Sequence, residues 1–127
     1  SDTNMADVLA VYLAGAWMVV HDRHVEASEV LRPARAISRD MTRMLASNPR
    51  FSRFTEAQRQ EVSESMILHL LAMDGRHSLY QQTGGAPLED GSTLADLQAS
   101  VRNMVKLWGL DLANLDLTDQ GFVSIRR

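Results

Sequence analysis

Apolar residues recur at three- and four-residue spacing in four separate segments of this chain, and that pattern restricts its fold more than any other feature. The period places the apolar side chains of each segment on one face of an α-helix. The segments run from Met5 to about His21, from about Ser28 to Asn48, from Thr55 to Tyr80 and from about Ser92 to Gly109. Amphipathic helices bury their apolar faces against one another. The sequence therefore predicts an all-α fold, a four-helix-type bundle.

The first segment is expected to be the central helix of the bundle. The thirteen residues from Val8 to Val20 carry no charge. Small residues such as Ala14 and Gly15 let neighbouring helices approach closely, and Trp17 fills volume on the other side. The run is shorter than the roughly 20 apolar residues that span a bilayer, so we expect a buried helix and no membrane insertion.

Local signals predict the course of the remaining chain. Thr55 and Gln58 match a capping box, and the helical register continues through Gly75, which predicts one long third helix. We expect residues 110–127 to form a C-terminal segment that wraps around the bundle in short helical turns. Thr118 is expected to cap one of these turns, and a short strand is the alternative.

Length and composition are those of one ordinary globular domain. The 127 residues are 45% apolar and 23% charged, close to the average for such domains. We therefore expect a single helical domain over residues 1–127. The chain has no cysteine, and it shows no P-loop, nucleophile-elbow or dinucleotide-binding pattern. The sequence thus favours a protein that is not an enzyme, and it predicts no cofactor.

The four histidines do not make a complete metal site. His21 and His24 lie three residues apart, but a third ligand is missing. His69 and His77 are eight residues apart, about 12 Å along a helix, which is too far for one ion. His77 falls on the apolar face of the third helix, where we expect a hydrogen-bonded core histidine. We therefore predict no metal site.

Four oxygen-bearing side chains in the C-terminal segment miss the spacing of a calcium-binding loop and lack its closing glutamate. Residues of these types commonly cap helices and form turns by bonding to nearby backbone amides, and we expect that role here. The four are Asp111, Asn114, Asp116 and Asp119.

Four arginines on the second helix are the strongest candidate for a binding site. Arg32, Arg35, Arg39 and Arg43 fall within about 80° of one another around the helix, opposite its apolar face. Arginine makes paired hydrogen bonds to carboxylates and phosphates. Every amphipathic helix also needs a solvated polar face, which is the alternative interpretation of the row.

Charge favours a protein partner over nucleic acid. Residues 23–59 carry eight arginines against four acids, whereas residues 60–127 carry nine acids against five bases. A net charge of −3, with no aromatic residues interleaved along the arginine row, is a poor match to nucleic acid. The sequence therefore favours a protein-interaction or structural module that binds a protein with an acidic surface or forms a homo-oligomer. An immunity- or inhibitor-like protein is one concrete version.

A different class of function remains open. A pocket between helices, lined by Trp17, His77, Tyr80 and Trp108, would make the chain a small ligand-binding protein or enzyme. A deep cavity with converging polar groups would distinguish this hypothesis from a docking module.

Four stretches along the chain form a recognisable pattern. They are Asn4-Met5-Ala6-Asp7 before a helix that ends near Trp17, residues 51–58, Leu107-Trp108-Gly109-Leu110-Asp111, and Leu117-Thr118-Asp119-Gln120-Gly121-Phe122. With them the chain resembles a bacterial family of exported helical domains of unknown function. The resemblance covers nearly the whole chain and implies a helical protein that is exported by a Gram-negative bacterium, so a periplasmic or secreted location is favoured over the cytoplasm. It brings no catalytic residues with it.

Overall fold

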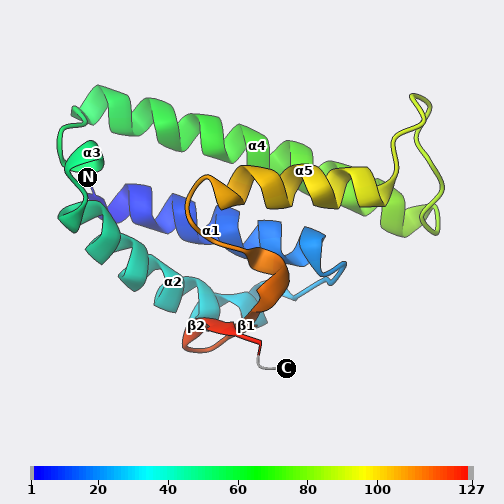
Figure 1. The fold of residues 1–127 in the computed structure, drawn as a ribbon, viewed down its shortest axis with the longest axis horizontal. Coiled ribbons are helices and arrows are strands. Elements are labelled where there is room, and N and C mark those ends of the chain that lie inside the picture. Colours follow the sequence, from blue (N-terminus) through cyan, green and yellow to red (C-terminus); the bar gives the residue numbers. More distant parts are fainter. Residues whose placement is uncertain (1, 126–127) are drawn as a thin grey trace.

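The protein folds as a bundle of α-helices with a small β-hairpin near its C-terminus (Figure 1). The structure is a computed structural model that describes residues 2–125, with side chains described from Met5 onward. It confirms the all-α fold class, because the only sheet among these residues has two short strands. The elements are α1 (Asp2–Val20), α2 (Ala27–Ser47), α3 (Pro49–Ser52), α4 (Glu56–Gln82), α5 (Leu94–Lys106), the 3-10 turn η1 (Leu112–Asn114), β1 (Leu115–Thr118) and β2 (Gly121–Ser124).

Helix α1 is the centre of the bundle, as its composition predicts. It packs against α2, α4, α5 and η1. Ala6, Leu9 and Ala16 are completely buried, and Trp17 is 3% exposed. A helix with apolar residues on nearly every side is stable in water only when other elements surround it.

The third predicted helix is continuous through Gly75, and its predicted capping box is present. The Gln58 amide donates to Thr55 Oγ1 at 3.1 Å, and the Thr55 amide donates to Gln58 Oε1 at 2.9 Å. Helix α4 comes very close to α1 at Gly15, where a Cβ atom would lie 2.6 Å from Leu70 Cδ1. The small residue at position 15 therefore makes room for the Leu70 side chain of α4.

The C-terminal segment corrects one expectation from the sequence. Thr118 does not cap a helical turn; it ends β1 and pairs with Gly121 across the hairpin, where its hydroxyl donates to the Gly121 carbonyl at 2.9 Å. The alternation of leucine with polar residues in this segment has the two-residue period of a strand. Gly121, with φ of +96°, lies directly against Ala36 and Ile37 of α2, so the hairpin packs on that helix.

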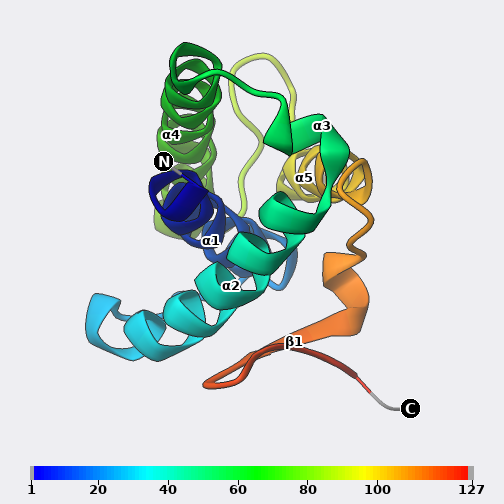
Figure 2. The same cartoon turned by 90° about the vertical axis from the view of Figure 1, so that its left-hand side faces the viewer.

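One side of the central helix α1 has no element of the described chain packed over it (Figure 2). Helix α5 and the C-terminal segment lie on one side of α1, while α2 and α4 flank it. On the opposite side of α1, no further element of residues 2–125 covers the gap between α2 and α4. Val11 of α1 is accordingly 50% exposed.

We expect Trp17→Ala to lower the free energy of unfolding by about 3–5 kcal/mol, because it leaves a large cavity beside α1. The indole also donates from Nε1 to the Leu115 carbonyl at 2.8 Å, so the substitution frees the C-terminal segment as well. Urea unfolding followed by circular dichroism measures the change. Leu107→Ala is the control, since Leu107 is 87% exposed and its loss should cost less than about 0.5 kcal/mol. A loss below about 1 kcal/mol for Trp17→Ala would contradict the assigned core.

Candidate functional site

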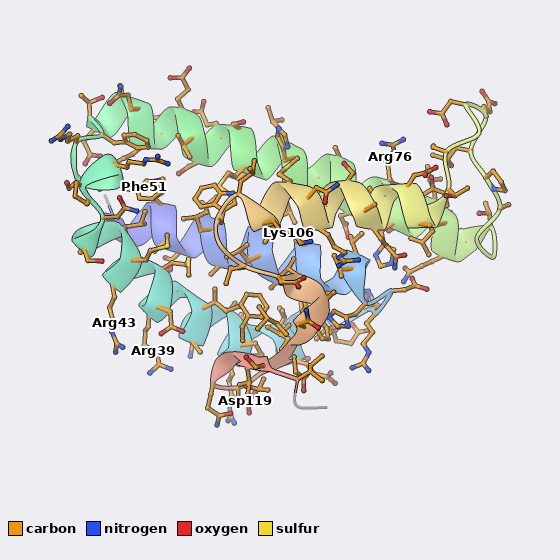
Figure 3. The ribbon with its side chains drawn as sticks, viewed as in Figure 1. Arg39, Arg43, Phe51, Arg76, Lys106 and Asp119 are labelled. Atoms are coloured by element: carbon orange, nitrogen blue, oxygen red, sulfur yellow. The ribbon has the colours of Figure 1, made fainter. Side chains whose placement is uncertain are left out.

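All four arginines of the predicted row are exposed on α2. The opposite face of the helix buries Pro33, Ala36, Ile37 and Leu45, so packing of that face turns the row toward solvent. Arg39 and Arg43 point away from the body of the bundle (Figure 3).

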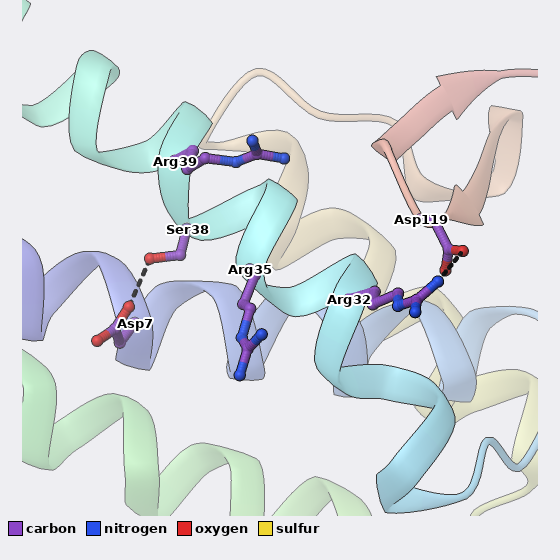
Figure 4. A pocket seen from close by; sticks show the side chains of 6 residues that line it. All are labelled: Asp7, Arg32, Arg35, Ser38, Arg39 and Asp119. Atoms are coloured by element: carbon purple, nitrogen blue, oxygen red, sulfur yellow. Dashed lines mark hydrogen bonds and ion pairs between the residues drawn. The ribbon is translucent and has the colours of Figure 1, made fainter.

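Three of the arginines line a surface groove of about 510 Å³ (Figure 4). Helix α2 supplies one wall, the N-terminal half of α1 a second, and the turn between β1 and β2 a third. Arg43 lies one turn beyond the groove and does not line it. We call this site the arginine groove; its lining residues are Asp7, Arg32, Arg35, Ser38, Arg39 and Asp119.

The groove has more positive than negative charge. Arg32 Nη1 lies 3.8 Å from Asp119 Oδ2, and both side chains are mostly exposed. The Ser38 hydroxyl donates to Asp7 Oδ1. Among the described residues, neither Arg35 nor Arg39 has a carboxylate within 4.0 Å. Two guanidinium groups thus remain available for a carboxylate or phosphate from outside the chain.

The sequence does not indicate the three other lining residues of the groove, Asp7, Ser38 and Asp119. Asp7 and Asp119 lie 112 positions apart in the sequence, and the packing of α1 and the hairpin on α2 brings both to the groove. Asp119 was expected only as a turn former. One sequence feature points to Asp7 as a residue that faces outward: it is an acid in an otherwise apolar helix.

His77 is a hydrogen-bonded core histidine, as predicted. It is 5% exposed, and its Nε2 lies 2.9 Å from Asp22 Oδ1. Asp22 follows α1 with φ of +49°, a left-handed conformation that Asp and Asn tolerate better than most residues. This pair therefore joins the end of α1 to α4.

The other candidate ligand residues do not converge. His21 Nε2 lies 2.8 Å from the Leu112 carbonyl, and His24 lies beside Glu26 on the surface. The Leu117 amide donates to Asp116 Oδ1, as expected of a turn former, whereas the Asn114 side chain donates to the Asp111 side chain and not to a backbone group. No three His, Asp or Glu side chains of the described part of the chain are grouped to hold a metal ion.

The four side chains of the hypothetical inter-helix pocket serve separate contacts. Trp17 bonds to Leu115, His77 to Asp22, and the Tyr80 hydroxyl lies 3.3 Å from Ser92 Oγ. Trp108 stacks on Phe51 of α3, with ring centroids 6.0 Å apart.

A different pocket of about 280 Å³ lies between α4 and α5. Tyr12 of α1 lines it, and the Tyr12 hydroxyl lies 2.9 Å from Met104 Sδ. Burial raises the pKa of the Tyr12 phenol. The phenol is protonated at neutral pH in any case, and it donates its hydrogen bond to Met104 Sδ.

Fold and site together define an all-α domain with a basic groove on its surface. This chain belongs to a family of unknown function (DUF6683), whose model matches residues 1–124. No curated protein and no solved structure matches the chain. None of the described helices is long and apolar enough to cross a membrane.

We expect Asp22→Asn to change the free energy of unfolding by less than about 0.5 kcal/mol, because asparagine tolerates the left-handed conformation and still accepts a hydrogen bond. Asp22→Ala should cost about 2–3 kcal/mol, since it loses the His77 contact and adds backbone strain. Thermal and urea unfolding of the two variants measure the difference. Equal stability of the two variants would show that the pair does not anchor α1 to α4.

Prolonged chelation should leave the melting temperature unchanged, because His21 already contacts a backbone carbonyl and, within residues 2–125, no second and third ligand lie beside it. A structural zinc ion contributes several kcal/mol, so its removal would be obvious in a thermal melt. A fall that added zinc reverses would contradict this prediction.

Proposed function

We propose that this protein is a docking module that binds a partner protein through carboxylates on the partner's surface. The observation that carries the proposal is the pair of arginines, Arg35 and Arg39, that lack a carboxylate partner within the described chain and lie in an open groove beside Arg32. A guanidinium group offers two parallel hydrogen bonds to a carboxylate, so three neighbouring arginines recognise a pattern of acids.

The groove suits a protein surface better than nucleic acid. Among its described lining residues there is no aromatic side chain on which a base could stack, and Asp7 and Asp119 repel a continuous phosphate backbone. The net charge of −3 opposes long-range attraction to nucleic acid as well. The partner is a protein with an acidic surface, either a different protein or a second copy of this chain.

The finer role that we propose is immunity- or inhibitor-like: a small helical domain, single over residues 1–127, that acts by occupying an acidic site on another protein. Its resemblance to exported bacterial helical domains supports a periplasmic or secreted location. A protein that acts by docking needs neither a cofactor nor catalytic residues.

The α4–α5 pocket supports a second candidate, a small ligand-binding protein. His69 and Arg76 lie at this pocket, which is otherwise largely apolar. Its volume of about 280 Å³ is at the lower limit of typical ligand sites, about 300–1,000 Å³, so docking remains the better-supported function.

The double variant Arg35→Gln, Arg39→Gln should leave folding intact and weaken binding to an acidic peptide. We would use a fluorescent peptide of alternating glutamate and glycine, and measure anisotropy at about 0.05 and about 0.5 M salt. Exposed charged contacts contribute about 0.5–1 kcal/mol each, so the loss should be about five- to thirtyfold at low salt and smaller at high salt.

The matched control is Arg50→Gln, Arg53→Gln, which removes the same charge from exposed positions around α3. It should weaken binding less than about twofold, because only the general attraction is reduced. Equal losses in both double variants would contradict a specific site in the arginine groove.

A further inference from the structure

One face of the bundle is uncovered and apolar. Val11 follows Asp7 by one turn on α1, and Ile67 and Leu71 lie one turn apart on α4. Leu31 lies two turns before Ser38 on α2, on the same side of that helix. We call these four residues the open face. Their exposed fractions are 50% for Val11, 55% for Leu31, 43% for Ile67 and 63% for Leu71.

The open face has the features of an interface. Large apolar side chains that are scattered singly over a surface need no explanation, but several that border one uncovered gap between helices mark a place where another molecule packs. The covered side of the bundle, by contrast, has α5 and the C-terminal segment over it (Figure 2).

Opposite charges flank the open face. On α2, the arginine of the row that borders the open face is Arg35, since Arg32 lies beside Asp119 and Arg39 and Arg43 point away from the bundle. Helix α4 is acidic, because it has only two arginines and four carboxylates, those of Glu56, Glu61, Glu64 and Asp74. Arg35 extends from α2 over α1 toward α4 (Figure 4).

The two charged flanks lie at the same level along the bundle. Ser38 of α2 contacts Asp7 of α1, while Gln60 and Ser63 of α4 line a pocket with Val8 of α1. The segment of α2 around Arg35 and the segment of α4 around Glu64 therefore flank the same part of α1.

We propose that the open face packs against the open face of a second copy, around a two-fold axis parallel to α1. This rotation exchanges the two flanks, so that α2 of one copy covers α4 of the other. Arg35 of each copy then meets Glu64 of the other, and the apolar side chains pack between the two contacts. The inference rests on the proposed function, because it names the acidic partner surface as α4 of the same protein.

Charge complementarity identifies the second copy as the occupant. A two-fold interface is self-complementary, so it needs both signs of charge on one surface, in positions that the rotation exchanges. The basic flank on α2 and the acidic flank on α4 meet that condition.

The first experiment compares the apolar contacts. Sedimentation equilibrium of the full chain should show a monomer–dimer equilibrium, and Leu71→Glu should weaken it by about a hundredfold or more, because it places a charge in the centre of the interface. Leu107→Glu is the matched control: this leucine is 87% exposed and lies outside the open face, so dimerisation should be unchanged. Circular dichroism and urea unfolding establish that both variants fold.

The second experiment tests the orientation of the two copies. Arg35→Glu and Glu64→Arg should each weaken dimerisation by about tenfold, and the double variant should recover to within about threefold of the original chain. Recovery distinguishes direct contact between these residues from a general effect of charge.

A monomer at all concentrations overturns the inference, as does a dimer that Leu71→Glu leaves intact or a charge exchange that does not recover. These failures differ from failure of the proposed function. A monomer that still binds the acidic peptide through Arg35 and Arg39 retains the docking function and loses only the second copy as its partner. If the arginine variants bind the peptide as the original chain does, the docking proposal itself fails.

Discussion

Burial of α1 is the constraint on which the rest of the structure depends. This helix has no polar face of its own, so α2, α4 and α5 pack around most of it. Groups from elsewhere in the chain add to the local backbone hydrogen bonds at its C-terminal end. Gln98 of α5 donates to the Val19 and Val20 carbonyls, which the helix leaves without intrahelical partners. Trp17 and His21 contact carbonyls of the C-terminal segment. One apolar helix therefore determines where three helices and the hairpin lie.

The arginine groove follows from that packing. Helix α2 turns Ala36 and Ile37 toward the interior, so its arginines face outward. Gly121 adopts a φ of +96°, which glycine tolerates, and lies against Ala36 and Ile37 of α2. The hairpin packed there places Asp119 beside Arg32. An isolated amphipathic helix would present the same arginines without walls. The groove has walls because two other elements are held against α2 by contacts unrelated to binding, and elements fixed in this way keep a site preorganised.

The sequence predicts those features that depend on a few neighbouring residues. Helix period, the capping box at Thr55, the continuity of α4 and the common face of the four arginines all follow from local spacing. The hairpin was not predicted as such, because its four-residue strands are too short for periodicity to distinguish them from helical turns. The acidic lining of the groove was missed because Asp7 and Asp119 meet α2 only in the folded chain. The open face depends on which side of α1 receives α5, and no local pattern encodes that choice.

Arg35 has two proposed roles, contact with a second copy and contact with an acidic partner, and it cannot perform both at once. Dimerisation and partner binding are therefore coupled. A guanidinium that contacts Glu64 of a second copy is not free for a carboxylate of another protein. If both proposals hold, binding of an acidic partner shifts the chain from dimer to monomer, and dimerisation weakens that binding by the same factor, because linkage is reciprocal. Arg32 differs from Arg35 in having a carboxylate of the same chain, that of Asp119, beside its guanidinium group. In this arrangement, self-association would prevent weak acidic ligands from binding in the groove. A partner that presents several carboxylates at once would still bind there, because only such a partner gains enough contacts to displace the second copy.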